Sequence, residues 1–315
     1  MTESGNARLD DAARAGWLYY IAGRTQDEIA RSLNVSRPTA QRLVSLCRAE
    51  NLITFRMTHP IGACMELAAR LAERHRLLHC DIVPADGTRA TSFTGMAEAA
   101  AIYLERMLRS GRSLAIALGT GRSMRASVER VAPAEYPLHR LISLVGNISP
   151  DGSASRFDAP GKLADITGAQ YFPMPLPLHA ATPEQRDQML AIDAVRRIFA
   201  LAADADIRLS GISQIDHDAV FLRDGFITRD ELFDSMRLGG VGEVIGWIFD
   251  RDGRILDQGL NCRVTSVAPH GSADRPHICV ACGADKVVPL HAALIGGLVN
   301  GLVTDETTAR MLLAC

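Results

Sequence analysis

The sequence predicts an α/β protein in which an N-terminal, all-α helix-turn-helix precedes a Rossmann-like α/β domain. The first reason is length, because 315 residues are enough for two domains, one of them with a full core. The second is that residues 1–57 show helical periodicity and two helix caps. The third is that strands and helices alternate over about 250 further residues, which favours a largely parallel sheet. We therefore expect domains at residues 1–57 and 58–315.

The first expected helix ends at Gly23, and its apolar residues recur at helical spacing. These residues are Ala13, Trp17, Tyr20 and Ile21. We interpret Trp17, Tyr19 and Tyr20 as packing residues of a core rather than as a platform on which bases stack. Behind the next two helices, residues 52–57 predict a short extended segment, and residues 58–62 predict a linker.

Two capped helices follow Gly23. Thr25 with Glu28 three residues later is a capping box, which predicts a helix start. Asn34-Val35 predicts a tight turn, and Ser36 caps the next helix, in whose first turn Pro38 is tolerated. The expected inward-facing residues are Ile29, Leu33, Ala40, Leu43, Val44 and Cys47.

This helix pair has the spacing of a DNA-binding helix-turn-helix, whose second helix enters the major groove. The candidate DNA-binding residues are Ser36, Arg37, Pro38, Thr39, Gln41 and Arg42. Arginine can pair with guanine, glutamine with adenine, and serine or threonine with phosphate. The alternative is a plain helical hairpin with a solvated face. Residues 1–57 carry eight Arg and six acids, so we expect operator affinity to need several joined copies.

The α/β domain is predicted to begin with a helix over residues 63–78 and a strand over residues 79–85. The other expected strands are Ser113–Leu118, Leu141–Gly146, Ala169–Met174, Ile207–Gly211, Val244–Phe249, Ile278–Ala281 and Leu302–Thr304. The expected helices are Gly95–Leu108, Arg122–Val131, one behind Thr182 and one behind Thr228 that ends at Gly239-Gly240. Ligands of such sheets bind at the carboxyl ends of the strands.

One strand end carries a candidate ligand loop. It consists of Gly119, Thr120, Gly121, Arg122 and Ser123. Glycines allow backbone N–H groups to approach an anion, and a following helix turns its positive end toward it. The loop has neither the Walker pattern nor the dinucleotide pattern, so it indicates a phosphate or a polyol, with an ordinary strand-to-helix turn as the alternative.

Two further segments strengthen the ligand-binding interpretation. Residues 238–257 contain a glycine-rich turn, Glu243 at the mouth of a strand, and an Asp-Arg-Asp-Gly hairpin turn. Residues 278–313 contain a strand, a loop with Lys286, and then a helix, a strand and a helix. Only two lysines occur in the chain, Lys162 and Lys286, so a lysine in a loop is informative.

With these segments the whole chain resembles the SorC-type sugar-binding transcriptional regulators, a DeoR/SorC-like family with a helix-turn-helix and an effector domain. The matching motifs are Gly121-Arg122-Ser123, Gly211-Ile212-Ser213, Gly239-Gly240-Val241-Gly242, Ala281 to Lys286, and Thr304-Asp305-Glu306 with Ala309. Ser213 and Cys282 depart from the family pattern, in which glycine stands at both places.

The resemblance implies an effector domain similar to glucosamine-phosphate deaminases and ribose-phosphate isomerases. It also implies a tetramer whose DNA binding responds to a phosphorylated sugar or a polyol. The family's ligand loop falls on Gly119 to Ser123, its phosphate lysine on Lys286 and its hydroxyl-binding acid on Glu243. Gln214 and Asp216, behind the turn at Gly211, are expected as contacts at the rim.

Net charge, the N-terminal sequence and the cysteines restrict the class of protein and its compartment further. A net charge of -2 argues against a polyanion binder that uses its whole surface, so any contact with DNA is local. The N-terminus has no secretory h-region, no segment reads as transmembrane, and seven unpatterned cysteines fit a reduced cytoplasm. Cys279-x-x-Cys282 is interpreted as part of a buried strand and its end, and we expect neither a metal nor a cofactor.

These observations favour a cytoplasmic transcriptional regulator that binds operator DNA and a sugar phosphate or polyol and has no enzymatic activity. Whether it acts as a repressor or as an activator stays open at this point. The first alternative is a sugar-phosphate isomerase or deaminase with an attached helix-turn-helix. That chemistry needs a general base near the substrate carbon, and Glu243 and Lys286 are the available candidates. The second alternative is an adaptor with a vestigial pocket. Whether the effector is phosphorylated stays open at this point, because Arg and Lys suggest phosphate whereas Glu and Gln suggest hydroxyls.

Overall fold

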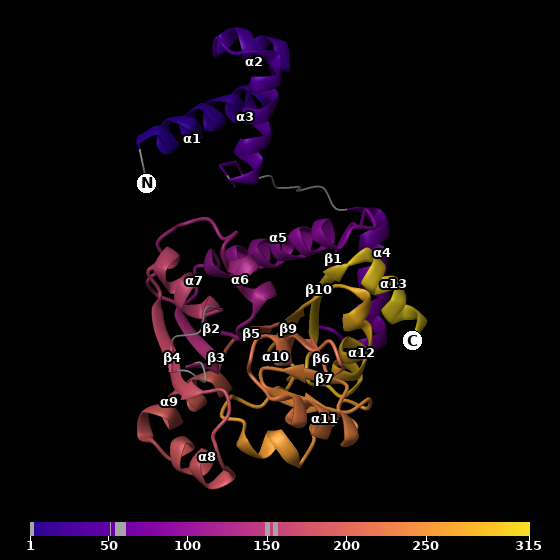
Figure 1. Ribbon diagram of the computed structural model, residues 1–315. Helices are drawn as coiled ribbons and strands as arrows, with labels where there is room; N and C mark the ends of the chain where they lie inside the picture. Colours follow the sequence, from indigo (N-terminus) through magenta and orange to yellow (C-terminus); the bar gives the residue numbers. More distant parts are fainter. Residues whose placement is uncertain (1–2, 51, 54–60, 149–151, 154–156) are drawn as a thin grey trace. The chain divides into compact units, whose positions relative to one another are not determined.

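The structure is a computed structural model that describes residues 3–50, 52–53, 61–148, 152–153 and 157–315 (Figure 1). The chain divides into two compact units, Met1–His59 and Pro60–Cys315. The extended segment and linker predicted over residues 52–62 lie mostly outside the described residues.

The N-terminal unit consists of four helical segments. These are α1 (Glu3–Gly16), the π-helix η1 (Trp17–Ile21), α2 (Gln26–Ser32) and α3 (Arg37–Ala49). Thr25 and Glu28 form the predicted capping box of α2, and the Ser36 side chain caps α3. The buried residues are Ala12, Ala15, Ile29, Ala30, Ala40, Leu43, Val44 and Cys47. The inward stripe predicted for α3 is therefore confirmed.

Two of the three aromatic residues predicted to pack in the core of the N-terminal unit do not do so. Trp17 and Tyr19 are 57% and 39% exposed, and Ile21 is 63% exposed, whereas only Tyr20 packs against the core. The reason is the orientation of α1, whose buried residues are Ala12 and Ala15, whereas Trp17 lies four residues after the exposed Ala13 on the same helix face. The π-helix over Trp17–Ile21 follows, and a π-turn holds more residues than an α-turn.

A sheet of seven parallel strands forms the centre of the C-terminal unit. Its order is β1-β10-β9-β5-β2-β3-β4, and every pairing is parallel. The strands are β1 (His79–Val83), β2 (Ala115–Leu118), β3 (Arg140–Ile148), β4 (Gln170–Pro177), β5 (Ile207–Ser210), β9 (His277–Val280) and β10 (Gly301–Asp305). The predicted parallel α/β domain is confirmed.

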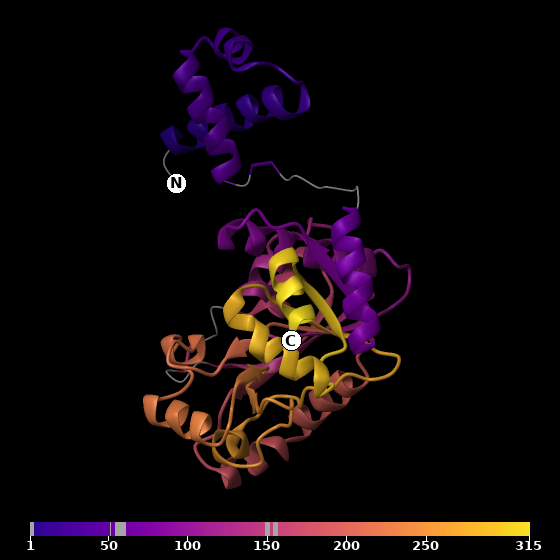
Figure 2. The ribbon, with the colours of Figure 1, turned by 90° about the vertical axis from the view of Figure 1, so that its right-hand side faces the viewer.

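Helices cover both faces of this sheet (Figures 1 and 2). One face carries α5 (Arg89–Leu108), α6 (Arg122–Val128) and α7 (Ala159–Thr167). The other carries α4 (Gly62–His75), α9 (Asp193–Ala203), α12 (Val287–Ile295) and α13 (Glu306–Ala314). Successive strand residues serve opposite faces, so Ala115 and Ala117 of β2 enter one core while Ile116 and Leu118 enter the other. No helix of the described residues is both long and apolar enough to cross a membrane.

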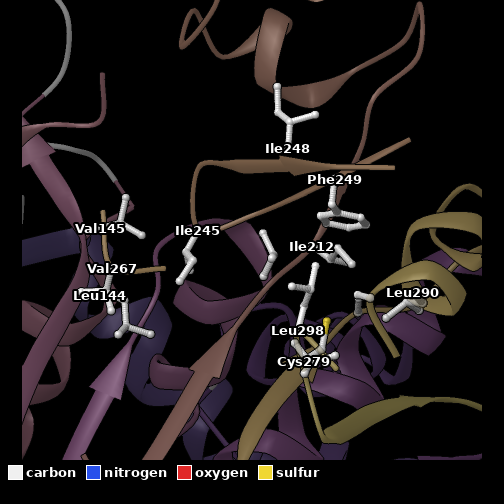
Figure 3. Close-up of a cluster of buried hydrophobic side chains, with 14 of the residues drawn as sticks. Leu144, Val145, Ile212, Ile245, Ile248, Phe249, Val267, Cys279, Leu290 and Leu298 are labelled. Atoms are coloured by element: carbon white, nitrogen blue, oxygen red, sulfur yellow. The ribbon is translucent and has the colours of Figure 1, made fainter. Parts of the chain in front are cut away.

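A small antiparallel sheet lies beyond the large one. It consists of β6 (Ser213–Gln214), β7 (Gly242–Val244) and β8 (Trp247–Phe249), with α8 (Pro183–Leu190), α10 (Val220–Arg223) and α11 (Arg229–Arg237) in the neighbouring connections. The single strand predicted over Val244–Phe249 is wrong, because the chain reverses at Ile245-Gly246. Both turn residues have positive φ, 46° and 91°, as in the type I′ turn of a two-residue hairpin. The residues around this hairpin form an apolar cluster with the sheet (Figure 3).

Candidate functional site

The chain order places a crevice between β2 and β5. From β2 the chain proceeds outward to β3 and β4, and β5 then returns to the other side of β2. Such a reversal of strand order separates the loops at the carboxyl ends of the two strands and leaves room for a ligand. A cavity of about 190 Å³ lies there, lined by residues that follow β2, β5 and β9. The expectation that a ligand site occupies the carboxyl edge of the sheet agrees with this geometry.

The loop behind β2 forms one wall of the cavity. Thr120, Gly121, Arg122 and Ser123 line it, and Gly121 immediately precedes α6. The φ of Gly121 is 113°, a conformation that residues with a side chain rarely adopt. Gly119 does not line the cavity. Its N–H donates to the Leu209 carbonyl oxygen at 2.8 Å and so extends the hydrogen bonding between β2 and β5.

A buried carboxylate and a buried ammonium form the polar floor. Glu243 lies opposite Ser213 in the small sheet, is 7% exposed, and accepts a hydrogen bond from the Gly246 N–H. Burial raises the pKa of Glu243 to about 6, against the opposing effects of its hydrogen bonds and of Lys286. The side chain of Lys286 is 12% exposed, and burial lowers its pKa. Its Nζ donates to the Gln214 side-chain oxygen, so Gln214 supports the site from behind rather than lining it.

Three ion pairs lie at the cavity, and two of them share one carboxylate. Arg122, the first residue of α6, binds the Asp224 carboxylate at 2.6 Å, and both residues line the cavity. Arg89, at the start of α5, binds Asp285 at 3.1 Å. Asp285 also lies 3.6 Å from Lys286 Nζ, so one carboxylate serves two cations. Neither Arg89 nor Asp224 was predicted from the sequence.

The rest of the wall is apolar and was also missed. It is formed by Phe93, Met96, Val145, Phe157, Leu178, Ile212, Val220, Phe221, Phe226, Ile245, Gly246, Val280, Ala281 and Cys282. Phe221 and Phe226 stack with ring centroids 5.4 Å apart. Apolar and aromatic surface of this kind suits the C–H face of a small carbohydrate and excludes water from the polar floor.

The hairpin turn behind Glu243 is conformationally strained. A β-branched residue rarely takes positive φ, yet Ile245 does so while buried against the cavity. The turn is held by the Gly246 N–H bond to Glu243, by the Ser266 hydroxyl, which donates to the Ile245 carbonyl oxygen, and by the apolar cluster of Figure 3. Glu243 therefore has a structural task besides any contact with a ligand.

The remaining predicted residues lie as follows. Gly211 and Glu243 line the cavity, whereas Asp216 does not; its carboxylate accepts from the Asp218 N–H in the connection to α10. Cys279 is buried in β9 and Cys282 reaches the cavity wall, both as free thiols. Burial raises their pKa values to about 12 and about 11. Within the described part of the chain, no group of three or more His, Cys, Asp or Glu side chains could hold a metal ion.

The predicted DNA-binding residues share the start of α3. Ser36, Arg37, Pro38, Gln41 and Arg42 are exposed, and Thr39 is half-buried. Arg37 lies 3.4 Å from Asp27 of α2, and the Thr39 hydroxyl is hydrogen-bonded to Ser36 and to Arg42. Ser45 and Arg48 continue the exposed face of α3 and were not among the predicted residues, although their helical spacing from Gln41 was visible in the sequence.

A helix-turn-helix unit joined to a doubly wound α/β unit with a cavity at its switch point defines a class: transcriptional regulators with a sugar-binding domain. Residues 59–314 match the family described as "Putative sugar-binding domain". The chain belongs to this family, and it is a SorC-type sugar-binding transcriptional regulator, as the resemblance predicted.

Relatives agree with this assignment along their whole length. The chain is 30% identical over 309 residues to the erythritol catabolism regulatory protein EryD of Brucella abortus, covering 98% of each chain. It is 31% identical over 309 residues to the transcriptional regulator LsrR of Klebsiella pneumoniae, covering 96% of this chain and 92% of the relative. The crystal structure of the full-length sorbitol operon regulator SorC of Klebsiella pneumoniae matches with a TM-score of 0.71 at 23% identity, covering 96% and 97% of the two chains.

Proposed function

We propose that the chain regulates an operon for the use of a carbohydrate or polyol, binding operator DNA through α3 and a small effector in the cavity at the β2/β5 switch point. The observation that carries this proposal is the meeting of three loops, from β2, β5 and β9, on one cavity in a chain that also has a helix-turn-helix. Relatives named for erythritol catabolism and for deoxyribonucleosides support an effector of the sugar or polyol class.

We infer that the effector carries an anionic group, a phosphate, toward Thr120–Ser123 and its hydroxyls toward the floor. The backbone N–H groups at the start of α6, with Arg122 and Lys286, suit an anion. Glu243 and Ser213 suit hydroxyl groups, and the phenylalanine side chains of the wall suit the carbon skeleton.

We infer further that the cavity senses its ligand without transforming it. Catalysis of isomerisation or deamination needs a general base that is free to take a proton from carbon. The Glu243 carboxylate is instead engaged by the Gly246 N–H and restrains the strained turn at Ile245. The names of the relatives as transcriptional regulators support the same conclusion.

The test is a thermal-shift screen of the full chain with sugars, polyols and their phosphate esters, followed by gel shifts on the operator. A ligand at 100 times its dissociation constant should add roughly 2.7 kcal/mol of stability. The same ligand should change operator affinity. A ligand that stabilises the chain but is consumed by it would instead support the enzyme hypothesis.

The domain boundaries and the assembly are part of the proposal. We propose that residues 58–315 fold alone and carry the oligomeric contacts of a homotetramer. The small unit has a core made largely of alanines and offers little apolar area for assembly, whereas DNA binding by a weakly charged helix-turn-helix needs several copies. Sedimentation of the fragment as a monomer at micromolar concentration would contradict this assignment.

A further inference from the structure

We propose that Asp224 is a specificity-determining residue, which occupies Arg122 in the empty cavity and which an anionic effector, but not a neutral one, must displace. This inference rests on the proposed function, because it assumes that the effector binds between Thr120–Ser123 and the floor. It assigns to Asp224 the selection between phosphate esters and free polyols.

The ion pair joins two elements that face each other across the ligand loop. Arg122 begins α6, and Asp224 follows α10, 102 positions further along the chain. Both residues line the cavity, and the charged atoms lie 2.6 Å apart. An anion bound at Thr120–Ser123 would meet Arg122 and the Asp224 carboxylate together, so it would be attracted by one and repelled by the other.

The backbone around Asp224 is held by hydrogen bonds, so an anion that displaces Asp224 from Arg122 moves the side chain and not the backbone. The Asp224 N–H donates to the Val220 carbonyl oxygen at 2.8 Å, and the Phe226 N–H donates to that of Phe221 at 3.1 Å. Phe221 and Ile227 on either side are 6% and 5% exposed and anchor the turn in the core. Displacement of Asp224 therefore needs a change of rotamer rather than the opening of a loop.

The other cations of the cavity are shared differently. Arg89 and Lys286 share one carboxylate, Asp285, so neither cation is matched by a carboxylate of its own in an ion pair. Arg122 faces Asp224 one to one at the ligand loop. This difference makes Asp224 the carboxylate whose removal should change anion affinity most.

Two roles of Asp224 predict opposite results. A competitor for Arg122 weakens anion binding, whereas a clamp that orients the guanidinium strengthens it. The Arg122 side chain is 51% exposed, and a pair of that exposure contributes at most about 1 kcal/mol. Removal of the competitor should therefore raise anion affinity by up to about five-fold.

The experiment compares the full wild-type chain with Asp224→Asn and, as a matched control, Asp218→Asn, which removes one exposed charge from the same connection. Titration calorimetry at constant ionic strength would use glycerol 3-phosphate, inorganic phosphate and glycerol as probes. We expect Asp224→Asn to bind both anions more tightly, by up to about five-fold, and to bind glycerol with unchanged affinity. Asp218→Asn should bind all three probes like the wild type. Melting temperatures of the three proteins report whether each folds, and Asp224→Ala should change anion affinity in the same direction.

Equal or weaker anion binding by Asp224→Asn, with wild-type binding intact, would overturn the role of Asp224 and leave the proposed function standing. A gain that includes glycerol would also overturn it, because charge competition would not be the cause. If neither anion binds any of the proteins, both this inference and the phosphate part of the proposed function are wrong.

Discussion

The two units of the chain place their functional side chains in opposite environments. On α3 the candidate DNA-binding side chains Arg37, Gln41 and Arg42 are exposed, and the core beneath them is small and rich in alanine. In the α/β unit Glu243 is 7% exposed, the Lys286 side chain is 12% exposed, and both lie beside two extensive apolar cores.

This difference in burial predicts different consequences when a side chain of each site is replaced. Exposed residues are already hydrated, so their removal should cost binding and leave folding almost unchanged. Buried charges are held by partners at a cost of desolvation, so their removal or neutralisation should change both binding and stability. The experiments below test this contrast in order of expected effect.

The largest effect is expected from the core of the small unit. Ile29→Ala should destabilise that unit by about 2–5 kcal/mol, because Ile29 is fully buried and the unit has few large side chains to fill the space. Ile21→Ala is the matched control, since Ile21 is 63% exposed in the same unit. Calorimetry should show the loss of one transition and of operator binding, while ligand-induced stabilisation of the α/β unit persists. A common shift of both transitions would contradict the independence of the units.

The second-largest effect is expected on effector affinity when Lys286 is replaced. Lys286→Ala should weaken a phosphorylated effector about ten- to a hundred-fold, because a hydrogen bond to a charged group contributes roughly 1.5–3 kcal/mol. Operator affinity without effector should hardly change. Titration calorimetry with the phosphate ester and the free sugar checks this. Equal losses for both ligands would mean that the lysine holds a hydroxyl group, and no loss for either would remove Lys286 from the site.

A smaller loss of binding free energy is expected from substitutions on the exposed face of α3. Arg37→Ala or Gln41→Ala should weaken specific operator binding by about 1–3 kcal/mol if each side chain makes a bidentate base contact. The stability of the unit should change by less than about 0.5 kcal/mol. Arg14→Ala removes the same charge from α1 and serves as the control in gel shifts. Wild-type affinity in both variants of α3 would show that another helix reads the operator.

The parts of the site that follow strands were predictable from the sequence. The ends of parallel strands must meet at one edge, so the loops that carry Thr120 and Lys286 could be brought together without knowledge of the packing. Glu243 was assigned through the family resemblance instead, since it lies in β7 of the antiparallel sheet. The helix caps at Thr25 and Ser36 are equally local, and both are present. Strand polarity accounts for the loop wall, whereas the roles of Glu243 and Lys286 in the polar floor came from the family resemblance.

The missed parts depend on contacts between distant segments. Asp224 meets Arg122 across 102 positions, and no periodicity marks it as a partner. Ile245 is a poor turn residue by its own preference, so the reversal between β7 and β8 is imposed by Glu243, Ser266 and packing. In the first helix, packing against α3 buries Ala12 and Ala15 rather than the Ala13 and Trp17 face that the apolar spacing suggested.

The smallest expected effect concerns Glu243, where the substitution should stabilise the folded chain rather than weaken folding. Its pKa is raised from 4.5 to about 6, so the folded chain binds a proton that the unfolded chain has released between these values. Stability is therefore lost as the pH rises through that interval, and at pH 7 the ionised carboxylate costs up to about 2 kcal/mol. Glu243→Gln keeps an oxygen that accepts from the Gly246 N–H and removes the charge.

Urea titrations should accordingly show the Glu243→Gln variant as the more stable protein at pH 7, and as equal to the wild type below pH 4.5. Glu66→Gln, at an exposed position of α4, should show no such difference. The Glu243→Gln variant should also bind the effector more weakly than the wild type. A buried charge that destabilises the empty protein is expected to be kept because it contributes to ligand binding. A loss of stability at pH 7 would mean that the charge of Glu243 is needed by Lys286 more than burial opposes it, and the contrast between the two units would then lose its strongest example.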